Sequence, residues 1–382
     1  MDADGSAVAE TTGGRWPPAA IVLIAAAAAT RLVNLGCAPY FFCDEALNVE
    51  TALGMMRTGS MVRYFFDLPV LSVGKPIFHY WLMAASFKLF GVGVWQGRLV
   101  SALLGIGTAA LVYLLARHLF GRVAGLTALA LYTFSRYTLY IDRSMKVDAQ
   151  AAFFAVLGIY LFVLAWESRR LPLMAAAGGA LGLSLFTKPS GFFVPLALLA
   201  YVIARWIRDR EHRRCLLALI PLAVGSALPL AIWIVYIAQA RDLPPYNLPL
   251  EQVTRGLRTD FVYDALPSPL GHRGLKGLAS GAVHLFANLL LRDEVRLAGL
   301  VGLLWAALAR RAGWAPLWAC VGAGLLCYSM AQWQSPRHLH VAYIVVIVCA
   351  GGVLGATYAH GRASPARRAL VVLAVAAMCF KG

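Results

Sequence analysis

The chain has 382 residues, of which 60% are hydrophobic and only 14% charged, and its mean hydropathy is +0.70. Soluble domains have a lower apolar fraction, and the apolar residues here form runs near the ~20 that a helix needs to cross a bilayer. The formal net charge of +16 does not indicate nucleic-acid binding, because the basic residues are spread among short loops. The sequence therefore predicts an all-α integral membrane protein with the lipid bilayer, and no nucleic acid, as its partner.

The N-terminal segment 1–16 is polar and rich in glycine, alanine and threonine. It contains one arginine and no small-residue cleavage site matched to a short apolar core, so it does not read as a cleaved signal peptide. We expect 1–16 to be a disordered cytoplasmic segment. The remainder, 17–382, is expected to form a single transmembrane domain without a soluble C-terminal domain.

Apolar runs divided by charged residues, glycine and proline predict the membrane spans in chain order. About eleven spans result, at 17–33, 97–116, 123–141, 148–166, 172–187, 190–207, 214–239, 296–309, 314–331, 339–358 and 366–380. Between the first two, the stretch 46–57 is amphipathic, and aromatic residues interrupt the apolar pattern of 77–90. We expect both stretches to be helices at the membrane surface, where aromatic residues are favoured.

The loops between these spans fall into two sets. Loops of one set are short and rich in arginine, which places them on the cytoplasmic side by the positive-inside rule; they lie near 117–122, 167–170, 205–214, 310–311 and 362–368. The other set contains the long loops 34–96 and 240–295 and the turns that carry most of the conspicuous acids and lysines. We expect this set to be external.

One segment could change this assignment. Residues 276–291 are apolar enough to form a short span, which would place every later loop on the opposite side. Since the arginine-rich loops after it would then be external, we interpret 276–291 as an interfacial or re-entrant helix.

Two adjacent carboxylates, Asp44 and Glu45, follow the first span. At the start of an amphipathic stretch they would cap a helix, since acids favour helix N-termini. A carboxylate at the membrane surface also suits a general base, because partial burial raises its pKa. Both roles can hold together, and Asp44 and Glu45 are candidate catalytic residues.

Three cations lie on the same predicted side of the membrane. Lys75 and Lys188 each precede a proline, and Arg337 lies in another turn. A solvated lysine before a helix-starting proline is ordinary, so each residue alone is a weak signal. Together they suit a phosphate group, which lysine binds as a point charge and arginine through paired hydrogen bonds.

The densest group of charges lies between 135 and 148. Arg136 and Arg143 are seven residues apart and share one helix face, and Arg136 would lie about two turns inside its span. That position is costly unless the charge meets polar groups or reaches the headgroups. Asp148 begins the next span, where it would cap the helix or hold Arg143. Arg143 is a phosphate-binding candidate and Asp148 a candidate catalytic acid.

The residues themselves require no metal and no organic cofactor. The seven cysteines show no spacing typical of a metal site, and five lie in or beside apolar runs as small hydrophobic residues. Cys37 and Cys43 share the first long loop, 34–96, and could form a disulfide there.

Six short motifs recur here in the order and spacing of a known family. They are Asp44-Glu45-Ala46, Lys75-Pro76 before Tyr80-Trp81, Leu89-Phe90-Gly91, Gly97-Arg98-Leu99, Arg143 with Asp148, and Leu185-Phe186-Thr187-Lys188. Over 31–200 the chain resembles the bacterial protein O-mannosyltransferase-like glycosyltransferases of the GT-C superfamily, a group that includes the aminoarabinose and galacturonic-acid transferases of lipopolysaccharide. The resemblance implies a GT-C helix bundle in the bacterial inner membrane, with its active site on the periplasmic face.

The resemblance also implies roles for individual residues. Asp44 matches the proposed catalytic base of the family, and Asp148 matches a site acid. Lys75 and Arg143 match positions near the donor phosphate, and Arg337 lies where the family often has an arginine facing that phosphate.

The chain departs from the family pattern at one motif. Where the family often has Glu-Lys-Pro-Pro, this sequence has Gly74-Lys75-Pro76-Ile77. The glutamate that some members use for a metal or substrate contact is therefore absent, which argues against dependence on a divalent metal.

The expected activity is sugar transfer from a polyprenyl-phosphate donor to an envelope lipid, glycan or protein acceptor. Asp44 would take the proton of the acceptor hydroxyl while the cations hold the departing phosphate, and the displacement would invert the anomeric configuration. Two alternatives stay open. The first is a transporter or flippase for lipid-linked sugars, which also needs phosphate-binding cations, although the sequence lacks the paired halves common in transporters. The second is an inactive, truncated family member.

Overall fold

The computed structural model describes most of the first 240 residues and two helices near the C-terminus. The described residues are 16–41, 43–59, 62–65, 68–71, 77–209, 212–240, 315–317, 319–321, 323, 340–359 and 364–381. Several predictions fall outside them. These are the positions of Lys75 and Arg337, the segment 276–291, the predicted span 296–309, nearly all of the predicted loop 240–295, and most of the span 314–331.

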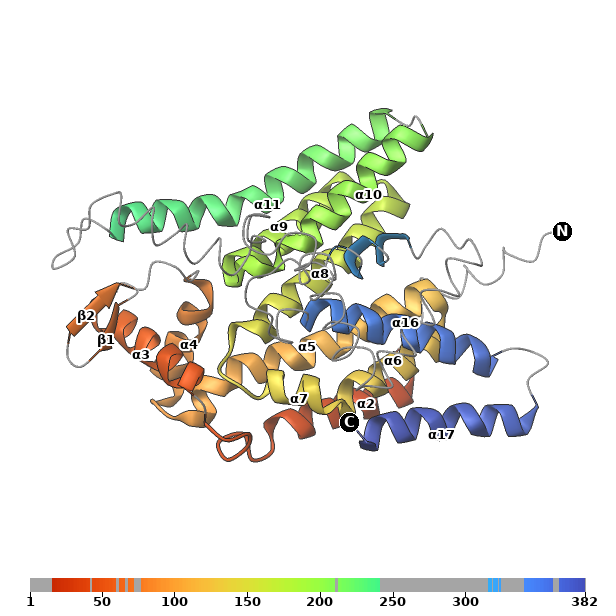
Figure 1. Ribbon diagram of the computed structural model, residues 1–382, viewed down its shortest axis with the longest axis horizontal. Helices are drawn as coiled ribbons and strands as arrows, with labels where there is room; N and C mark the ends of the chain where they lie inside the picture. Colours follow the sequence, from red (N-terminus) through yellow and green to blue (C-terminus); the bar gives the residue numbers. More distant parts are fainter. Residues whose placement is uncertain are drawn as a thin grey trace, which may run out of the picture.

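Long apolar helices dominate the described part of the chain and confirm the predicted helical membrane fold. Within the described residues, four stretches are long and apolar enough to cross a membrane: α5 (Val94–Phe120), α8 (Val147–Ser168), Cys215–Tyr236 within α11 (His212–Ala240), and α16 (His340–Ala359). Further apolar helices are α2 (Pro18–Leu32), α6 (Arg122–Phe134), α9 (Leu171–Thr187), α10 (Phe193–Asp209) and α17 (Pro365–Lys381). The helices pack in one bundle (Figure 1), in which α8 and α11 both flank α9.

The two ends of this bundle differ in charge. At one end, His118 near the end of α5 lies 2.7 Å from the Glu167 carboxylate near the end of α8. The arginine-rich turns that follow both helices therefore lie together. At the other end, Lys188 after α9 meets Asp148 at the start of α8. The division of loops predicted from their charges thus agrees with the described helices.

The predicted span 123–141 is not one helix. It consists of α6 and a short helix α7 (Arg136–Asp142), separated at Ser135, whose backbone is extended (φ −61°, ψ 122°). The break is stabilised locally, because the Ser135 side chain accepts a hydrogen bond from the Thr138 N–H and the Thr138 hydroxyl donates to the Tyr132 carbonyl. Arg136 is consequently the first residue of α7 and does not lie two turns inside a continuous helix.

The first long loop folds at one end of the bundle. It contains α3 (Cys43–Thr58) and α4 (Phe78–Phe90), which confirm that the two predicted stretches are helical (Figure 1). Between them lies an antiparallel pair of strands, β1 (Val62–Phe65) and β2 (Leu68–Leu71), with Val62 opposite Leu71. The all-α prediction missed this hairpin, although its valine, tyrosine and phenylalanine residues favour strands.

Small residues let α9 and α11 pack closely. A Cβ added to Gly178 would lie 2.5 Å from the Leu222 carbonyl oxygen, and one added to Gly182 would lie 2.7 Å from that of Ser226. Two glycines four residues apart are a recurrent means of close helix contact in membranes, where packing replaces the hydrophobic effect as the driving force. The contact fixes α11 along the length of α9.

Candidate active site

The candidate site is built on a buried ion pair between the first long loop and α5. Glu45, in the first turn of α3, accepts hydrogen bonds from Arg98 Nε at 2.9 Å and Nη2 at 3.0 Å, and Arg98 Nη1 donates to the Leu35 carbonyl at 3.0 Å. Arg98 is fully buried and Glu45 is 1% exposed. A bidentate arginine–carboxylate contact restrains both groups, so α3 is fixed to the bundle at its N-terminus.

The same loop holds both polar groups of the Met145 backbone, in the turn between α7 and α8. Glu45 Oε1 accepts from the Met145 N–H at 2.9 Å, and the Asn48 amide donates to the Met145 carbonyl at 2.6 Å. The Tyr80 hydroxyl of α4 donates to Asn48 at 3.1 Å. These contacts place the half-buried Asp44, one residue before Glu45, next to the turn that leads into α8.

Asp148 and Lys188, predicted separately from the sequence, form an ion pair. Lys188 Nζ lies 2.6 Å from Asp148 Oδ1, with side-chain exposures of 11% and 3%. Asp148 is in the first turn of α8, and Lys188 is the extended residue that ends α9. The following proline explains this ending, since a residue before proline is disfavoured in the helical region.

A second polar contact joins α8 to α4. His79 Nδ1, in α4, is 3.0 Å from Gln150 Oε1, in α8, and both side chains are fully buried. The sequence interpretation overlooked Gln150, because a single glutamine near the start of an apolar span has no motif around it. Its burial at membrane depth is the signal that could have identified it.

Arg143 binds backbone carbonyls at the end of α2. Its guanidinium donates to the carbonyls of Thr30, Asn34 (3.0 Å) and Ala38 (3.2 Å). The last carbonyls of a helix lack helical partners, and a cation there also complements the helix dipole. Burial, together with the nearby Arg98 and Arg31 charges, lowers the pKa of Arg143. Asp148, expected to cap α8 or hold Arg143, pairs with Lys188.

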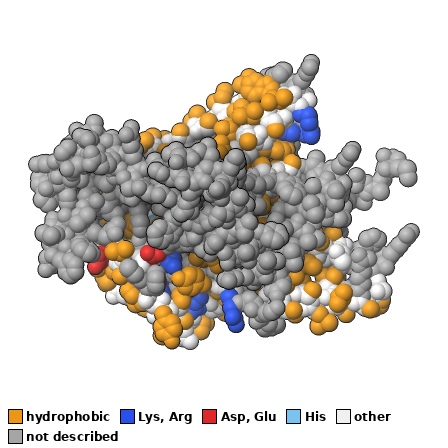
Figure 2. Space-filling view, viewed as in Figure 1, with side chains coloured by type: hydrophobic (Ala, Val, Ile, Leu, Met, Phe, Trp, Pro, Cys, Tyr) orange, Lys and Arg blue, Asp and Glu red, His pale blue; other side chains and the backbone are white. Residues whose placement is uncertain are grey.

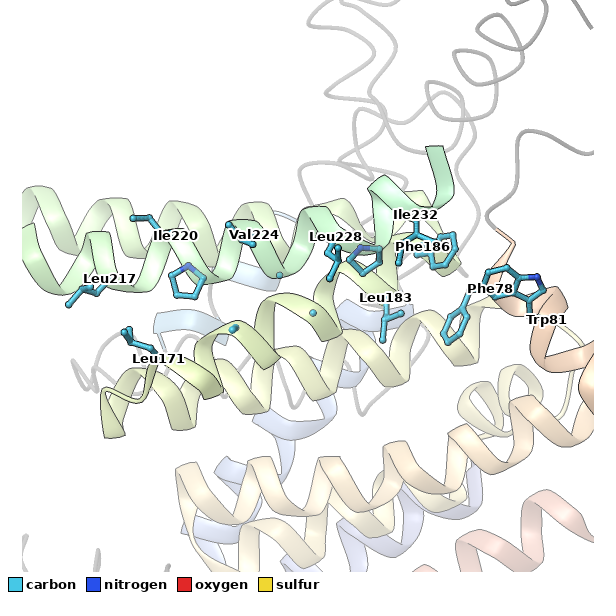
Figure 3. A pocket seen from close by; sticks show the side chains of 15 residues that line it. Phe78, Trp81, Leu171, Leu183, Phe186, Leu217, Ile220, Val224, Leu228 and Ile232 are labelled. Atoms are coloured by element: carbon cyan, nitrogen blue, oxygen red, sulfur yellow. The ribbon is translucent and has the colours of Figure 1, made fainter. Parts of the chain in front are cut away.

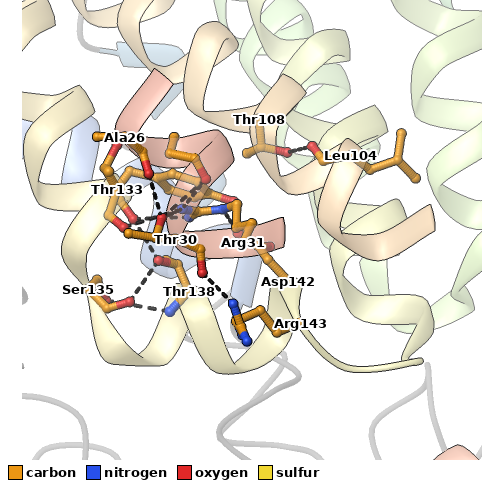
Figure 4. A network of polar contacts seen from close by, with 12 residues as sticks. Ala26, Thr30, Arg31, Leu104, Thr108, Thr133, Ser135, Thr138, Asp142 and Arg143 are labelled. Carbon is orange, nitrogen blue, oxygen red and sulfur yellow. Dashed lines mark hydrogen bonds and ion pairs between the residues drawn. The ribbon is translucent and has the colours of Figure 1, made fainter. Parts of the chain in front are cut away.

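A deeper network joins α2 to α7 (Figure 4). Arg31 Nε lies 2.8 Å from Asp142 Oδ2, which also accepts from the Tyr132 hydroxyl at 2.9 Å. Arg31 additionally donates to the Thr133 carbonyl at 3.2 Å, and both charged side chains are buried. The sequence interpretation did not single out Arg31. An arginine inside an apolar run was the available signal, because such a charge needs a polar partner.

An apolar groove lies between α9 and α11 (Figure 3). Its volume is about 880 Å³, and every residue lining it is apolar or glycine: Phe78, Trp81, Leu171, Ala175, Gly179, Leu183, Phe186, Leu217, Ile220, Pro221, Val224, Gly225, Leu228, Pro229 and Ile232. Leu171 and Leu217 lie at one end, and Phe78, Trp81 and Phe186 at the other. Phe186 precedes Lys188 by two residues, so the second end approaches the ion pair.

Apolar and charged side chains also occupy different regions of the molecular surface (Figure 2). Hydrophobic side chains cover α10 and α11, while acidic and basic side chains lie next to each other near α3.

Among the described residues, no three histidine, cysteine, aspartate or glutamate side chains are grouped to hold a metal ion. Cys37 is a free thiol, so the disulfide considered for the first long loop does not form here.

The family model described as Dolichyl-phosphate-mannose-protein mannosyltransferase matches residues 74–237. This segment contains the Asp148–Lys188 pair, both residues of the His79–Gln150 contact, and the whole groove between α9 and α11.

Curated relatives match a similar part of the chain. An uncharacterized protein of Aquifex aeolicus is 31% identical over 173 residues, which are 44% of this chain and 37% of that protein. The putative mannosyltransferase YkcB of Bacillus subtilis is 31% identical over 136 residues, 35% of this chain and 19% of that protein. The chain thus matches little more than a third of the first relative and a fifth of the second.

A solved structure extends the likeness over nearly the whole chain. ArnT from Cupriavidus metallidurans, bound to undecaprenyl phosphate, has a TM-score of 0.69 and 20% identity, over 93% of this chain and 62% of that chain. The fold is therefore shared although most side chains differ. The chain therefore has the fold of ArnT, and its residues 74–237 are similar to the mannosyltransferase family.

Proposed function

We propose that this protein transfers a sugar from a polyprenyl-phosphate donor to an acceptor of the cell envelope. The observation that carries the proposal is the position of Lys188, a cation paired with Asp148, beside one end of a groove lined only by apolar residues and glycine. A phosphate with a prenyl tail has the complementary chemistry, because lysine binds phosphate and an apolar groove buries hydrocarbon. The structural neighbour ArnT was solved with undecaprenyl phosphate bound.

The dimensions of the groove suit a lipid tail. Its lining follows α9 from Leu171 to Phe186, roughly 22 Å at the rise of an α-helix. Such a length is comparable to most of the hydrocarbon thickness of one bilayer. The prenyl chain would lie along α9, with its phosphate at the end nearest Lys188.

The leaving group requires cations and does not require a strong acid. A lipid phosphate departs as an anion that is stable in water, so the site must stabilise negative charge on its oxygens. We assign this role to Lys188 and, outside the described residues, to Lys75 and Arg337. Arg143 contributes positive charge nearby while its guanidinium holds the end of α2.

Asp44 is our candidate for the general base. It would remove the proton from the acceptor hydroxyl, whose oxygen attacks the anomeric carbon as the bond to the phosphate oxygen breaks. Attack opposite the leaving group inverts the anomeric configuration. Glu45 is less suited to this step, because both its oxygens accept hydrogen bonds from Arg98. We assign it the positioning of α3, and therefore of Asp44.

We further propose that the site faces the periplasm from the inner membrane of a bacterium. The arginine-rich turns lie at the opposite end of the bundle, and such turns are enriched on the cytoplasmic side. An acceptor would then be an envelope lipid, glycan or protein.

A turnover assay tests the proposal. Purified full-length chain would be incubated with undecaprenyl phosphates carrying radiolabelled mannose, glucose or aminoarabinose, together with an envelope extract as acceptor. We expect labelled acceptor and free undecaprenyl phosphate to appear together, and Asp44→Asn to slow both by about 10²–10⁴-fold. Glu50→Gln, an exposed acid on the same helix, is the matched control and should keep the full rate.

Two outcomes would contradict it. Turnover by Asp44→Asn at the unmodified rate would remove Asp44 as the base. Movement of the labelled lipid across vesicle membranes without any release of lipid phosphate would identify a flippase instead, because a flippase breaks no bond to the sugar.

A further inference from the structure

One buried histidine in the described part of the chain has no hydrogen-bond partner. His340 is the first residue of α16, is 2% exposed, and contacts the Tyr137 ring edge-on with centroids 5.4 Å apart. Neither of its ring nitrogens makes a hydrogen bond. One turn further along α16, the Tyr343 hydroxyl lies 3.0 Å from the Ser135 hydroxyl. A polar side chain on the same face of α16 is therefore matched, whereas His340 is not.

An unmatched imidazole destabilises the protein that contains it. Burial removes water from both ring nitrogens, and no protein group replaces it. Leucine at this position would fill a similar space beside its apolar neighbours Val341 and Ala342 without that cost. The imidazole is therefore suited to a hydrogen-bonding group that the protein itself does not supply.

The position of His340 points to the donor site. Its ring contacts Tyr137 of α7, and α16 packs against α8, whose first turn carries Asp148 of the pair that we place at the donor phosphate. A neutral imidazole offers one donor and one acceptor. Phosphate oxygens only accept, whereas a sugar hydroxyl does both. A sugar hydroxyl is thus the better match, and the lysine serves the phosphate.

We propose that His340 binds a hydroxyl group of the donor sugar, next to the phosphate held at Lys188. This inference rests on the proposed function, since it requires that a lipid-linked sugar enters this site. It adds a residue of α16, far along the chain, to the Asp148–Lys188 pair that α8 and the end of α9 supply.

The test compares a lipid with and without its sugar. Binding of undecaprenyl phosphate, and of undecaprenyl phosphates carrying mannose, glucose or aminoarabinose, would be measured for the purified full chain in nanodiscs. His340→Leu should weaken binding of a sugar-bearing lipid roughly tenfold, the effect of one lost hydrogen bond, and leave binding of undecaprenyl phosphate unchanged. His340→Gln retains a donor and an acceptor and should recover part of the loss.

Thermal unfolding of the same variants tests whether a folding defect explains any loss of binding. His340→Leu should melt no lower than the unmodified chain, because it removes two unsatisfied buried nitrogens. If His340→Leu binds every lipid as tightly as the unmodified chain, the inference is wrong while the proposed function stands. The same holds if the variant loses affinity equally for the lipids with and without a sugar. If the unmodified chain binds none of these lipids, the proposed function is wrong and the sugar contact falls with it.

Discussion

Arg98 and Arg31 are fully buried at the end of the bundle that holds the candidate site. Each pairs with a carboxylate from a distant segment, Glu45 and Asp142 respectively. The carboxylates offset the cost of burying the guanidinium groups, and the remaining donors reach backbone carbonyls. Each buried guanidinium of the scaffold therefore has a carboxylate partner within the protein.

The Glu45–Arg98 pair leads to a stability prediction. Glu45→Gln removes the charge that compensates a fully buried guanidinium, and breaking a buried pair in this way costs about 3–5 kcal/mol. The melting temperature of the purified variant should fall markedly, whereas Glu50→Gln, on the exposed side of the same helix, should stay within about 0.5 kcal/mol of the unmodified chain. A Glu45→Gln variant that is fully stable but inactive would indicate a chemical role for this carboxylate.

At the level of single residues, the sequence was a better guide to the charged residues of the site than to the residues with which they pair. Asp148 and Lys188 were selected because they stand at span ends, and they prove to be in contact. Arg98 is 53 residues from Glu45, and Arg31 is 111 residues from Asp142. No local pattern links such pairs, because their contact arises only when the helices pack. The catalytic and phosphate-binding roles assigned to the candidate residues stay predictions.

Glycines determine how closely the helices approach. Gly351 and Gly355 of α16 face α6, where added Cβ atoms would lie 2.6 Å from the Ala128 Cβ and the Ala124 backbone. Gly178 and Gly182 have the same four-residue spacing on α9. Both contacts use close backbone approach in place of large interlocking side chains, and they set the positions of α11 and α16, the two helices that carry the groove wall and His340.

Two glycines of α9 make a matched comparison. In Gly182→Ala the new methyl would lie 2.7 Å from the Ser226 carbonyl oxygen, so α9 and α11 must separate, at a cost of about 1–3 kcal/mol. Nothing lies within 4 Å of a Cβ at Gly179, so Gly179→Ala should be neutral or slightly stabilising. Melting temperatures of both variants in detergent would check this, and an equal loss in the two would show that close packing at Gly182 is unimportant.

Helix positions followed from the apolar runs wherever those runs were uninterrupted. The span predicted at 148–166 is α8 at 147–168, and that predicted at 172–187 is α9 at 171–187. The break at Ser135 was not foreseen, because the apolar run was extended through Ser135 and Arg136 to residue 141. Ser135 supplies the cap, and serine also occurs inside membrane helices, so its presence alone does not mark a helix end.

Across the whole molecule, the apolar groove and the polar candidate site occupy different parts of one helix bundle. The groove extends along α9 toward the arginine-rich end, whereas the ion pairs and the first long loop lie at the other end. Under the proposed function, donor recognition would be divided, with the tail bound through hydrocarbon contact along the bundle and the headgroup through polar groups at its end. The length of the tail should accordingly affect binding and leave the bond chemistry unchanged.

Filling the groove separates these two contributions. Gly179 lines the groove and nothing lies within 4 Å of a Cβ added there, so Gly179→Leu directs a side chain into the groove. We expect it to raise KM roughly tenfold for an undecaprenyl donor and to leave a geranyl donor with the same sugar unaffected. Val235→Leu, on the exposed side of α11, is the control. Equal KM values for the long donor in Gly179→Leu and the control would exclude the groove as the tail site.

The contacts at Met145 have a mechanical consequence. Because α3 holds both the N–H and the carbonyl of this one residue, through Glu45 and Asn48, it cannot tilt or slide without shifting the chain that enters α8. Asp44 stands at the start of α3, and Asp148 lies three residues beyond Met145. Asp44 and Asp148 are therefore coupled through the backbone, since a shift of the first turn of α3 would also shift the start of α8.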